Sequence, residues 1–337
     1  MNLIIVTINS KLISIITLLA LLIACTNPST NQYEYLEKDA SFRSKILKRE
    51  GGHFIQLSDG FTYYKEANEN SAKDVIILIH GFSVPSYIWN PTYQKLKNQG
   101  FRVITLDLYG RGFSDNLDTD YTDLLMANQV LELLNHLNIN QAHFVGLSNG
   151  GRIISQAAVL KPQLIQSLIY VSSNSFEDIE ETTDISVSID EINEFISRYP
   201  EIALGQLDDF FDPTQFPNWS KKYTTLQQFK GFAQALISTR KNHTTMDSIH
   251  QKINYLNLPV YTIWGVADRI VVYANFKDKL AKLLPNRKEF FIKKSAHLPQ
   301  IENKTAFEDL LINSILLEDS VKINAKEGTL NLIKLPR

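Results

Sequence analysis

The chain has 337 residues, 44% of them hydrophobic, which is enough for one large core but short for two independent enzyme domains. Its 34 Lys and Arg nearly balance its 36 Asp and Glu, so it lacks the basic field with which proteins bind nucleic acid, and we expect no such partner. With a single cysteine, Cys25, no intramolecular disulfide can form, and the core alone must hold the fold.

The first residues are typical of a targeting segment. Lys11 is followed by an apolar run from 12 to 24, shorter than the ~20 residues that a membrane-spanning helix needs. The run ends in Leu22-Ile23-Ala24-Cys25, which resembles the lipobox of bacterial lipoproteins. The resemblance implies a signal peptide over residues 1–24, cleavage before Cys25 and acylation of that cysteine, which ties the protein to a membrane of the cell envelope. The alternative is an uncleaved anchor with an incidental cysteine.

A polar stretch follows over residues 25–50, and we expect a tether with little core of its own. From Phe54 onward, β-branched and aromatic runs alternate with helix-like stretches, which is typical of an α/β protein with a mainly parallel sheet. Most runs are apolar throughout, as strands covered by helices on both faces should be. The predicted strands are 75–79, 102–106, 142–147, 167–171, 259–264 and 289–292, preceded by an edge hairpin of 54–57 and 61–65.

This alternation stops between about residues 176 and 257, where acidic and aromatic residues mix with helical segments and several prolines. We expect an inserted helical cap there, because caps of this kind form one wall of a substrate site. The expected organisation is a core in two parts, residues 51–175 and 258–319, which the cap at 176–257 separates. A C-terminal tail over 320–337 carries no further signal.

A Gly-x-Ser-x-Gly pentapeptide, Gly146 to Gly150, follows the third of the buried strands and opens a helix. This is the context of a nucleophile elbow, in which Ser148 occupies a strained turn and the flanking glycines let strand and helix pass closely. The pentapeptide alone would occur by chance in about one chain of this length in ten. The assignment of Ser148 as a nucleophile therefore depends on the position of the pentapeptide after a buried strand and on the further motifs described below.

A second signal, His80-Gly81-Phe82, directly follows the first buried strand. Acyl transfer passes through a tetrahedral oxyanion, which preorganised backbone N–H groups stabilise. We expect the N–H groups of Phe82 and Asn149 to form this pair, with Asn149 at a helix N-terminus whose dipole favours negative charge. His80 is expected to hold the loop, and the glycine-rich turn at 107–114 to shape the site without taking part in the chemistry.

The candidate acid and base, Asp268 and His297, each lie just past a predicted strand. In a triad of this kind His297 takes the proton of Ser148 and returns it to the leaving group, while Asp268 fixes the histidine tautomer. Glu177 and Asp178, one strand earlier, are alternatives for the acid. Asp268 is preferred, because it alone sits in a short turn at a strand end.

With these motifs in the order Ser, Asp, His, the sequence resembles the α/β-hydrolase superfamily over roughly residues 54–319. Within that superfamily it resembles bacterial monoacylglycerol lipase and carboxylesterase relatives. The resemblance implies a helix-flanked, mainly parallel sheet and a serine hydrolase that cleaves a small or lipid-like carboxylic ester through an acyl-enzyme on Ser148, without a cofactor. A carbon–carbon bond hydrolase, a lactonase or a cofactor-free perhydrolase could use the same residues. A surface binding protein that keeps the scaffold without turnover is a third hypothesis.

Phe82 and Trp89 are candidates for the substrate-binding wall, with core packing as the alternative for each. Arg152, in the first turn of the helix after the elbow, is more typical of a salt bridge than of a substrate contact. The remaining histidines show no ligand spacing, so we predict no metal site.

Overall fold

The computed structural model describes residues 32–180 and 182–317. The predicted signal peptide, Cys25 and the predicted tail at 320–337 lie outside the described residues. In the part that is described, none of the helices is both long and apolar enough to span a membrane.

Among the described residues, eight strands form one sheet in the order β1-β2-β4-β3-β5-β6-β7-β8. β1 and β2 pair antiparallel at one edge, β2 pairs antiparallel with β4, and the other neighbours are parallel. The strands are β1 (His53–Gln56), β2 (Phe61–Ala67), β3 (Val75–Ile79), β4 (Arg102–Leu106), β5 (Ala142–Leu147), β6 (Ile165–Val171), β7 (Val260–Gly265) and β8 (Lys288–Ile292). The predicted α/β fold with a mainly parallel sheet is confirmed.

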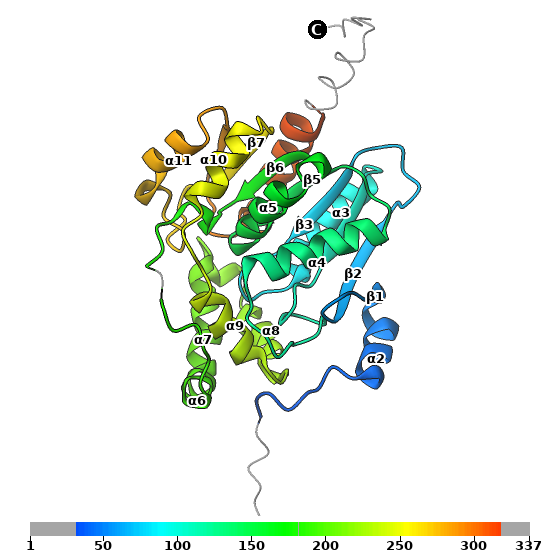
Figure 1. The fold of residues 1–337 in the computed structure, drawn as a ribbon, viewed down its shortest axis with the longest axis vertical. Helices are drawn as coiled ribbons and strands as arrows, with labels where there is room; N and C mark the ends of the chain where they lie inside the picture. Colours follow the sequence, from blue (N-terminus) through cyan, green and yellow to red (C-terminus); the bar gives the residue numbers. More distant parts are fainter. Residues whose placement is uncertain (1–31, 181, 318–337) are drawn as a thin grey trace, which may run out of the picture.

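Helices cover both faces of the sheet (Figure 1). In β3, Ile77 and Ile79 belong to a core cluster on one face, while Ile76 and Leu78 belong to a second cluster on the other. The alternation follows from the period of two along a strand, and it explains why β3 is apolar throughout. The first cluster is covered by α4 (Asp123–His136), α5 (Asn149–Leu160), α10 (Asp247–Tyr255) and α11 (Lys277–Leu283), and the second by α3 (Asn90–Asn98), α12 (Pro299–Glu302), α13 (Lys304–Asp309) and the π-helix Leu310–Leu316.

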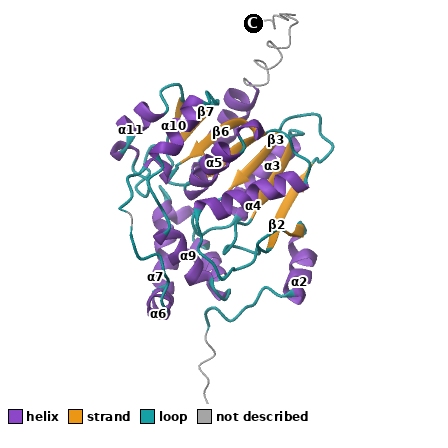
Figure 2. Ribbon diagram, in the orientation of Figure 1, coloured by secondary structure: helices purple, strands orange, loops and turns teal. Residues whose placement is uncertain are grey.

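Between β6 and β7 the described residues form helices and loops only, which Figure 2 shows as purple and teal ribbon. The helices before α10 are α6 (Ile189–Ser197), α7 (Tyr199–Gly205), α8 (Trp219–Thr224) and α9 (Phe232–Lys241). Aromatic side chains fill the interior of this insertion. The ring of Phe210 stacks on Phe216 at 4.1 Å and meets Trp219 edge-on at 5.1 Å. We call these residues, 176–257, the cap.

Residues 33–38, here called the N-terminal strap, lie against the cap, where Leu36 forms an isolated β-bridge with Phe229. The N–H of Glu34 donates to the carbonyl of Gln227 at 2.9 Å, and the N–H of Leu36 donates to that of Gln228 at 2.8 Å. The Glu34 carboxylate also accepts the N–H groups of Gly231 and Ala233, at 2.9 and 2.7 Å. It therefore sits at the N-terminus of α9, where the helix dipole favours a negative charge.

Beyond the strap, α2 (Ala40–Glu50) packs against both the core and the cap. Ile46 is buried, and the ring of Phe42 lies 6.1 Å from Phe113 of the core and 5.5 Å from Phe229 of the cap. The sequence predicts a tether with little core of its own over residues 25–50; among the described residues 32–50, α2 packs on the core and the cap rather than forming a core itself. The reason is that the few apolar side chains of this polar stretch find partners that lie far along the chain.

We predict that Glu34→Gln lowers the free energy of unfolding by about 1–2 kcal/mol, because charge-assisted hydrogen bonds to the start of α9 become neutral ones. Urea denaturation measures the change. Glu37→Gln is the matched control, since Glu37 makes only an exposed ion pair with Lys230 at 2.9 Å. Equal stability of the two variants would contradict the role given to Glu34.

Candidate active site

Ser148 occupies a strained turn between β5 and α5. Its backbone has φ 50° and ψ −117°, a region that few residues other than glycine adopt, and its N–H donates to the carbonyl of Val171 at 2.8 Å. A Cβ at Gly150 would lie 2.6 Å from the carbonyl oxygen of His80, so only glycine lets the helix start this close to the neighbouring loop. The turn has the geometry expected of a nucleophile elbow.

The loop after β3 lies directly beside this turn. The Cβ position of Gly81 is 3.4 Å from the Cβ of Ser148. His80 is within hydrogen-bond distance of two backbone groups: its Nδ1 lies 2.9 Å from the Gly81 carbonyl, and its Nε2 accepts the N–H of Leu108 at 2.9 Å. Burial lowers the pKa of His80 to about 3, so the ring is neutral. His80 therefore holds the loop in place.

Arg111 ties the same loop to the cap. Its side chain is buried; Nε donates to the carbonyl of Phe82 at 2.8 Å, and Nη2 donates to the hydroxyl of Thr239 in α9 at 2.8 Å. Burial lowers the pKa of Arg111 to about 10, which leaves it charged at neutral pH. The partly exposed ring of Phe82 lies edge-on to the cap residue His243, with ring centres 6.2 Å apart. Phe82 thus stands at the boundary between core and cap.

His297 and Asp268 meet beyond the ends of β8 and β7. The Nδ1 atom of His297 lies 3.0 Å from Oδ2 of Asp268, and Oδ1 of Asp268 accepts the N–H groups of Ile270 and Val271. A carboxylate held in this way keeps the proton on Nδ1 and leaves Nε2 as the acceptor. A Cβ at Gly265 would lie 1.8 Å from the carbonyl oxygen of the residue before His297, so this loop rests directly on the end of β7.

Acidic groups from the cap and from the loop after β7 act on the imidazole. Burial lowers the pKa of His297, but the carboxylates of Asp268, Asp209 and Glu177 raise it more, and the net pKa is above the ordinary value. The backbone N–H of His297 also donates a hydrogen bond to the backbone carbonyl of Asp209 at 2.9 Å. Burial raises the pKa of the Asp209 carboxyl to about 6 and raises that of Glu177.

The structure distinguishes Asp268 from Glu177 and Asp178, the alternatives for the acid of the triad. The side chain of Asp178 is 83% exposed and pairs with Lys279 at 2.5 Å. Glu177 acts on His297 through its charge, whereas the hydrogen bond to the imidazole comes from Asp268. Asp268 is therefore the carboxylate positioned to orient the ring.

Ser148 and His297 lie at the same edge of the sheet. Ser148 follows β5, and His297 rests on the end of β7, with only β6 between them, so the two strand ends are about 10 Å apart. Within residues 32–180 and 182–317, the imidazole of His297 forms a hydrogen bond with Asp268. Within this part of the chain it forms none with the Ser148 hydroxyl. Catalytic hydrogen bonds are often long in enzymes without substrate and tighten in the complex.

Other sequence candidates take different places. Trp89 is buried, with its ring 6.1 Å from Phe307, so it packs between the sheet and the C-terminal helices. Arg152 forms a buried ion pair with Asp123 at 2.8 Å. The Asn149 side chain is also buried, and its oxygen and nitrogen have no hydrogen-bond partner among the described residues.

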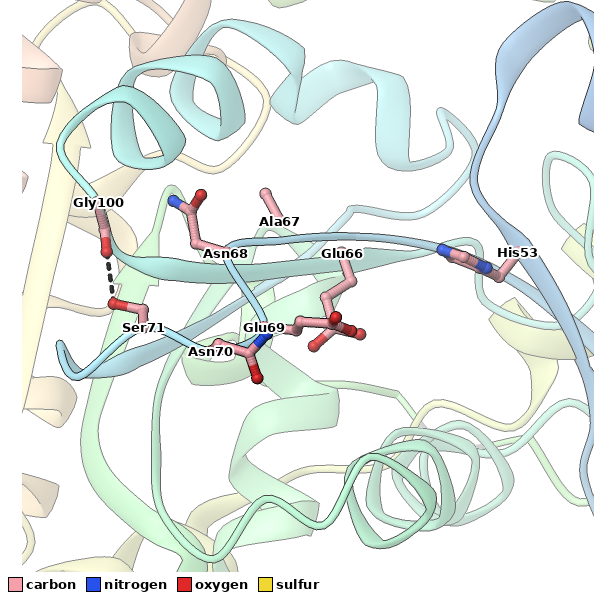
Figure 3. Close-up of a pocket in the computed structure, with 8 residues that line it drawn as sticks. All are labelled: His53, Glu66, Ala67, Asn68, Glu69, Asn70, Ser71 and Gly100. Atoms are coloured by element: carbon pink, nitrogen blue, oxygen red, sulfur yellow. Dashed lines mark hydrogen bonds between the residues drawn. The ribbon is translucent and has the colours of Figure 1, made fainter.

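An open hollow of about 590 Å³ lies at the opposite end of the parallel strands, away from Ser148 (Figure 3). It is lined by Ala67 at the end of β2 and by Gly100 just before β4, and Ser71 donates a hydrogen bond to the Gly100 carbonyl at 2.6 Å. Ligands of open α/β sheets bind at the carboxyl ends of the parallel strands. This hollow lies where those strands begin, so it is not the site built around Ser148.

Three supporting residues were not singled out in the sequence: Asp209, Arg111 and Glu302. Glu302 accepts the N–H of Ala296 at 2.7 Å and the N–H of the cap residue Phe211, which fixes the loop before His297. Nothing in the local sequence marks these roles, because each of the three residues has at least one partner that lies far along the chain. Within the described residues, no group of three or more His, Cys, Asp or Glu side chains could hold a metal ion.

Comparisons of the sequence and of the structure with known proteins agree on the fold. The profile described as alpha/beta hydrolase fold matches residues 74–304. The chain is 26% identical over 250 residues to the hydrolase YugF of Bacillus subtilis, covering 71% of this chain and 89% of that protein. It is 23% identical to 3-oxoadipate enol-lactonase 1 of Acinetobacter baylyi, with 76% and 94% covered. An esterase structure from Exiguobacterium antarcticum superposes with a TM-score of 0.65 at 17% identity, covering 78% and 98%.

We predict that His297 titrates above the ordinary histidine pKa of about 6.5, and that Asp209→Asn lowers this pKa by removing a nearby negative charge. Because the neutral imidazole is the base, His297 of the variant should stay deprotonated down to a lower pH than in the unaltered chain. NMR titration of the imidazole measures both values. Asp208→Asn, one residue away and exposed, is the control. An unchanged pKa in Asp209→Asn would contradict the electrostatic account.

Proposed function

Because the chain belongs to the alpha/beta hydrolase fold family, we propose that it is a serine hydrolase that cleaves a carboxylic ester, with Ser148 as nucleophile. The observation that carries the proposal is the pairing of His297 with Asp268 at the sheet edge where Ser148 occupies a strained turn. Such a base, oriented by a carboxylate, activates a serine hydroxyl that is otherwise a weak nucleophile.

In the proposed mechanism, His297 Nε2 removes the proton of Ser148 as the hydroxyl oxygen attacks the ester carbonyl. The oxyanion is stabilised by the N–H groups of Phe82 and Asn149. Asn149 is the first residue of α5, so its N–H has no partner within the helix, and the Arg111 bond to the Phe82 carbonyl fixes the loop. His297 then protonates the leaving alcohol, and water hydrolyses the acyl-enzyme by the same route.

The proposed substrates are small or lipid-like acyl esters, as for carboxylesterases and monoacylglycerol lipases. Phe82 supports this choice, because it follows Gly81, which packs on Ser148, and its partly exposed ring at the boundary with the cap offers an apolar contact to an acyl chain. A lactone is the second candidate, since one relative is named an enol-lactonase and a lactone is a cyclic ester.

We predict that Ser148→Ala abolishes covalent labelling by a fluorophosphonate and lowers turnover by about 10⁴-fold or more. Ser172→Ala is the matched control, because Ser172 also has a positive φ (44°) at the end of the neighbouring strand β6. Nitrophenyl esters of increasing acyl length, assayed beside a γ-lactone, identify the substrate class. Labelling that persists in Ser148→Ala, or turnover of none of these substrates, would argue against the proposal.

We further propose that the mature protein is a lipoprotein of the cell envelope. The support is the lipobox-like sequence ending at Cys25, which is the only cysteine of the chain. In a bacterial host, Cys25→Ser should abolish incorporation of labelled palmitate and release the protein from the membrane fraction, since one lipidated residue supplies the attachment. Membrane association that survives the substitution would refute lipid anchoring at Cys25.

A further inference from the structure

A cavity of about 420 Å³ lies where α2, the core and the cap meet. Its walls include the rings of Phe42, Phe113 and Phe229, contributed by these three parts in turn. The three rings pack on one another, with Phe113 lying 6.1 Å from Phe42 and 6.5 Å from Phe229. Its volume is within the range of roughly 300–1,000 Å³ that small-molecule sites occupy.

The cavity lies apart from Ser148. It is bounded by Tyr87, in the turn that follows the Phe82 loop, and by Asp107 and Gly112 in the turn after β4. Ser148 is not among its lining residues. A ligand here would therefore not compete directly with an ester at the proposed active site.

The lining is electropositive at its rim. Arg49, Lys65 and Lys222 face the cavity together with two carboxylates, Glu50 and Asp107, which leaves a net charge of +1. Both carboxylates already have partners within the fold. Glu50 pairs with Arg49 at 2.8 Å, and Asp107 accepts the N–H groups of Ser86 and Phe113 at 2.9 and 2.8 Å.

The two lysines are less fully partnered, although the Glu50 carboxylate also attracts Lys222. Among the described residues, neither Lys65 nor Lys222 forms an ion pair. The Nζ atom of Lys222 instead lies 3.5 Å above the ring centre of Tyr87, a cation–π contact that holds the charge at the cavity wall. An apolar body with a single negative charge would fill the aromatic interior and neutralise the rim.

From this combination we infer a second binding site, specific for an amphiphilic carboxylate, in which the apolar part packs among Phe42, Phe113 and Phe229 and the carboxylate meets Lys65 and Lys222. Because α2, the core and the cap each supply part of the wall, a bound carboxylate stabilises their junction. This site is independent of the hydrolytic activity proposed for Ser148.

Calorimetric titration of the full chain with octanoate tests the site, with octan-1-ol as an uncharged probe of the same length. Octanoate should bind at least tenfold more tightly than octan-1-ol. The double variant Lys65→Met/Lys222→Met, which keeps apolar stems, should lose that preference. Lys221→Met, the exposed neighbour outside the cavity, should bind like the unaltered chain.

Thermal unfolding of the ligand-free variants shows that folding is intact, and octanoate should raise the midpoint of the unaltered chain but not of the double variant. Equal binding of octanoate and octan-1-ol would overturn the inference. So would octanoate binding that survives in the double variant, which would place the ligand elsewhere, including at Ser148.

Discussion

Close contact between backbones at the carboxyl edge of the sheet is the constraint on which this structure depends. The start of α5 touches the loop after β3 at Gly150, and the loop that carries His297 touches the end of β7 at Gly265. A side chain at either point would push apart segments that must meet. Because β3, β5, β6, β7 and β8 are parallel neighbours, their following loops gather at this one edge, which brings together residues as distant in sequence as His80 and His297.

Charged side chains then connect the cap to the strap and to the loops at this edge. Glu34 holds the strap against the start of α9, Arg111 bridges the Phe82 loop to α9, and Glu302 joins the loop before His297 to the cap residue Phe211. Each of these groups is satisfied by backbone or hydroxyl partners, so the charge can be buried or half-buried without a large desolvation penalty. The position of the cap is therefore determined by polar contacts as well as by its aromatic interior.

The sheet could be predicted from sequence because its central strands are mainly apolar. β3, β4 and β5 begin and end at the predicted residues, while β6, β7 and β8 differ by one or two residues. The elbow and the pairing of His297 with Asp268 follow from local motifs at strand ends. The packing of residues 33–50 could not be predicted, since Phe42 and Ile46 are among the few apolar residues of a polar stretch and their partners lie far along the chain. Asp209 likewise gives no local signal, because its effect on His297 arises only when the cap folds over the core.

The proposed mechanism requires that Ser148, His297 and the N–H groups of Phe82 and Asn149 act on one ester carbonyl group. A crystal structure of the covalent phosphonate adduct tests it most directly. The adduct should show phosphorus bonded to Ser148 Oγ, one phosphonyl oxygen about 3 Å from both N–H groups, and His297 Nε2 within hydrogen-bond reach of Oγ. An adduct on another residue, or an imidazole that stays out of reach of Ser148 Oγ in the adduct, would contradict it.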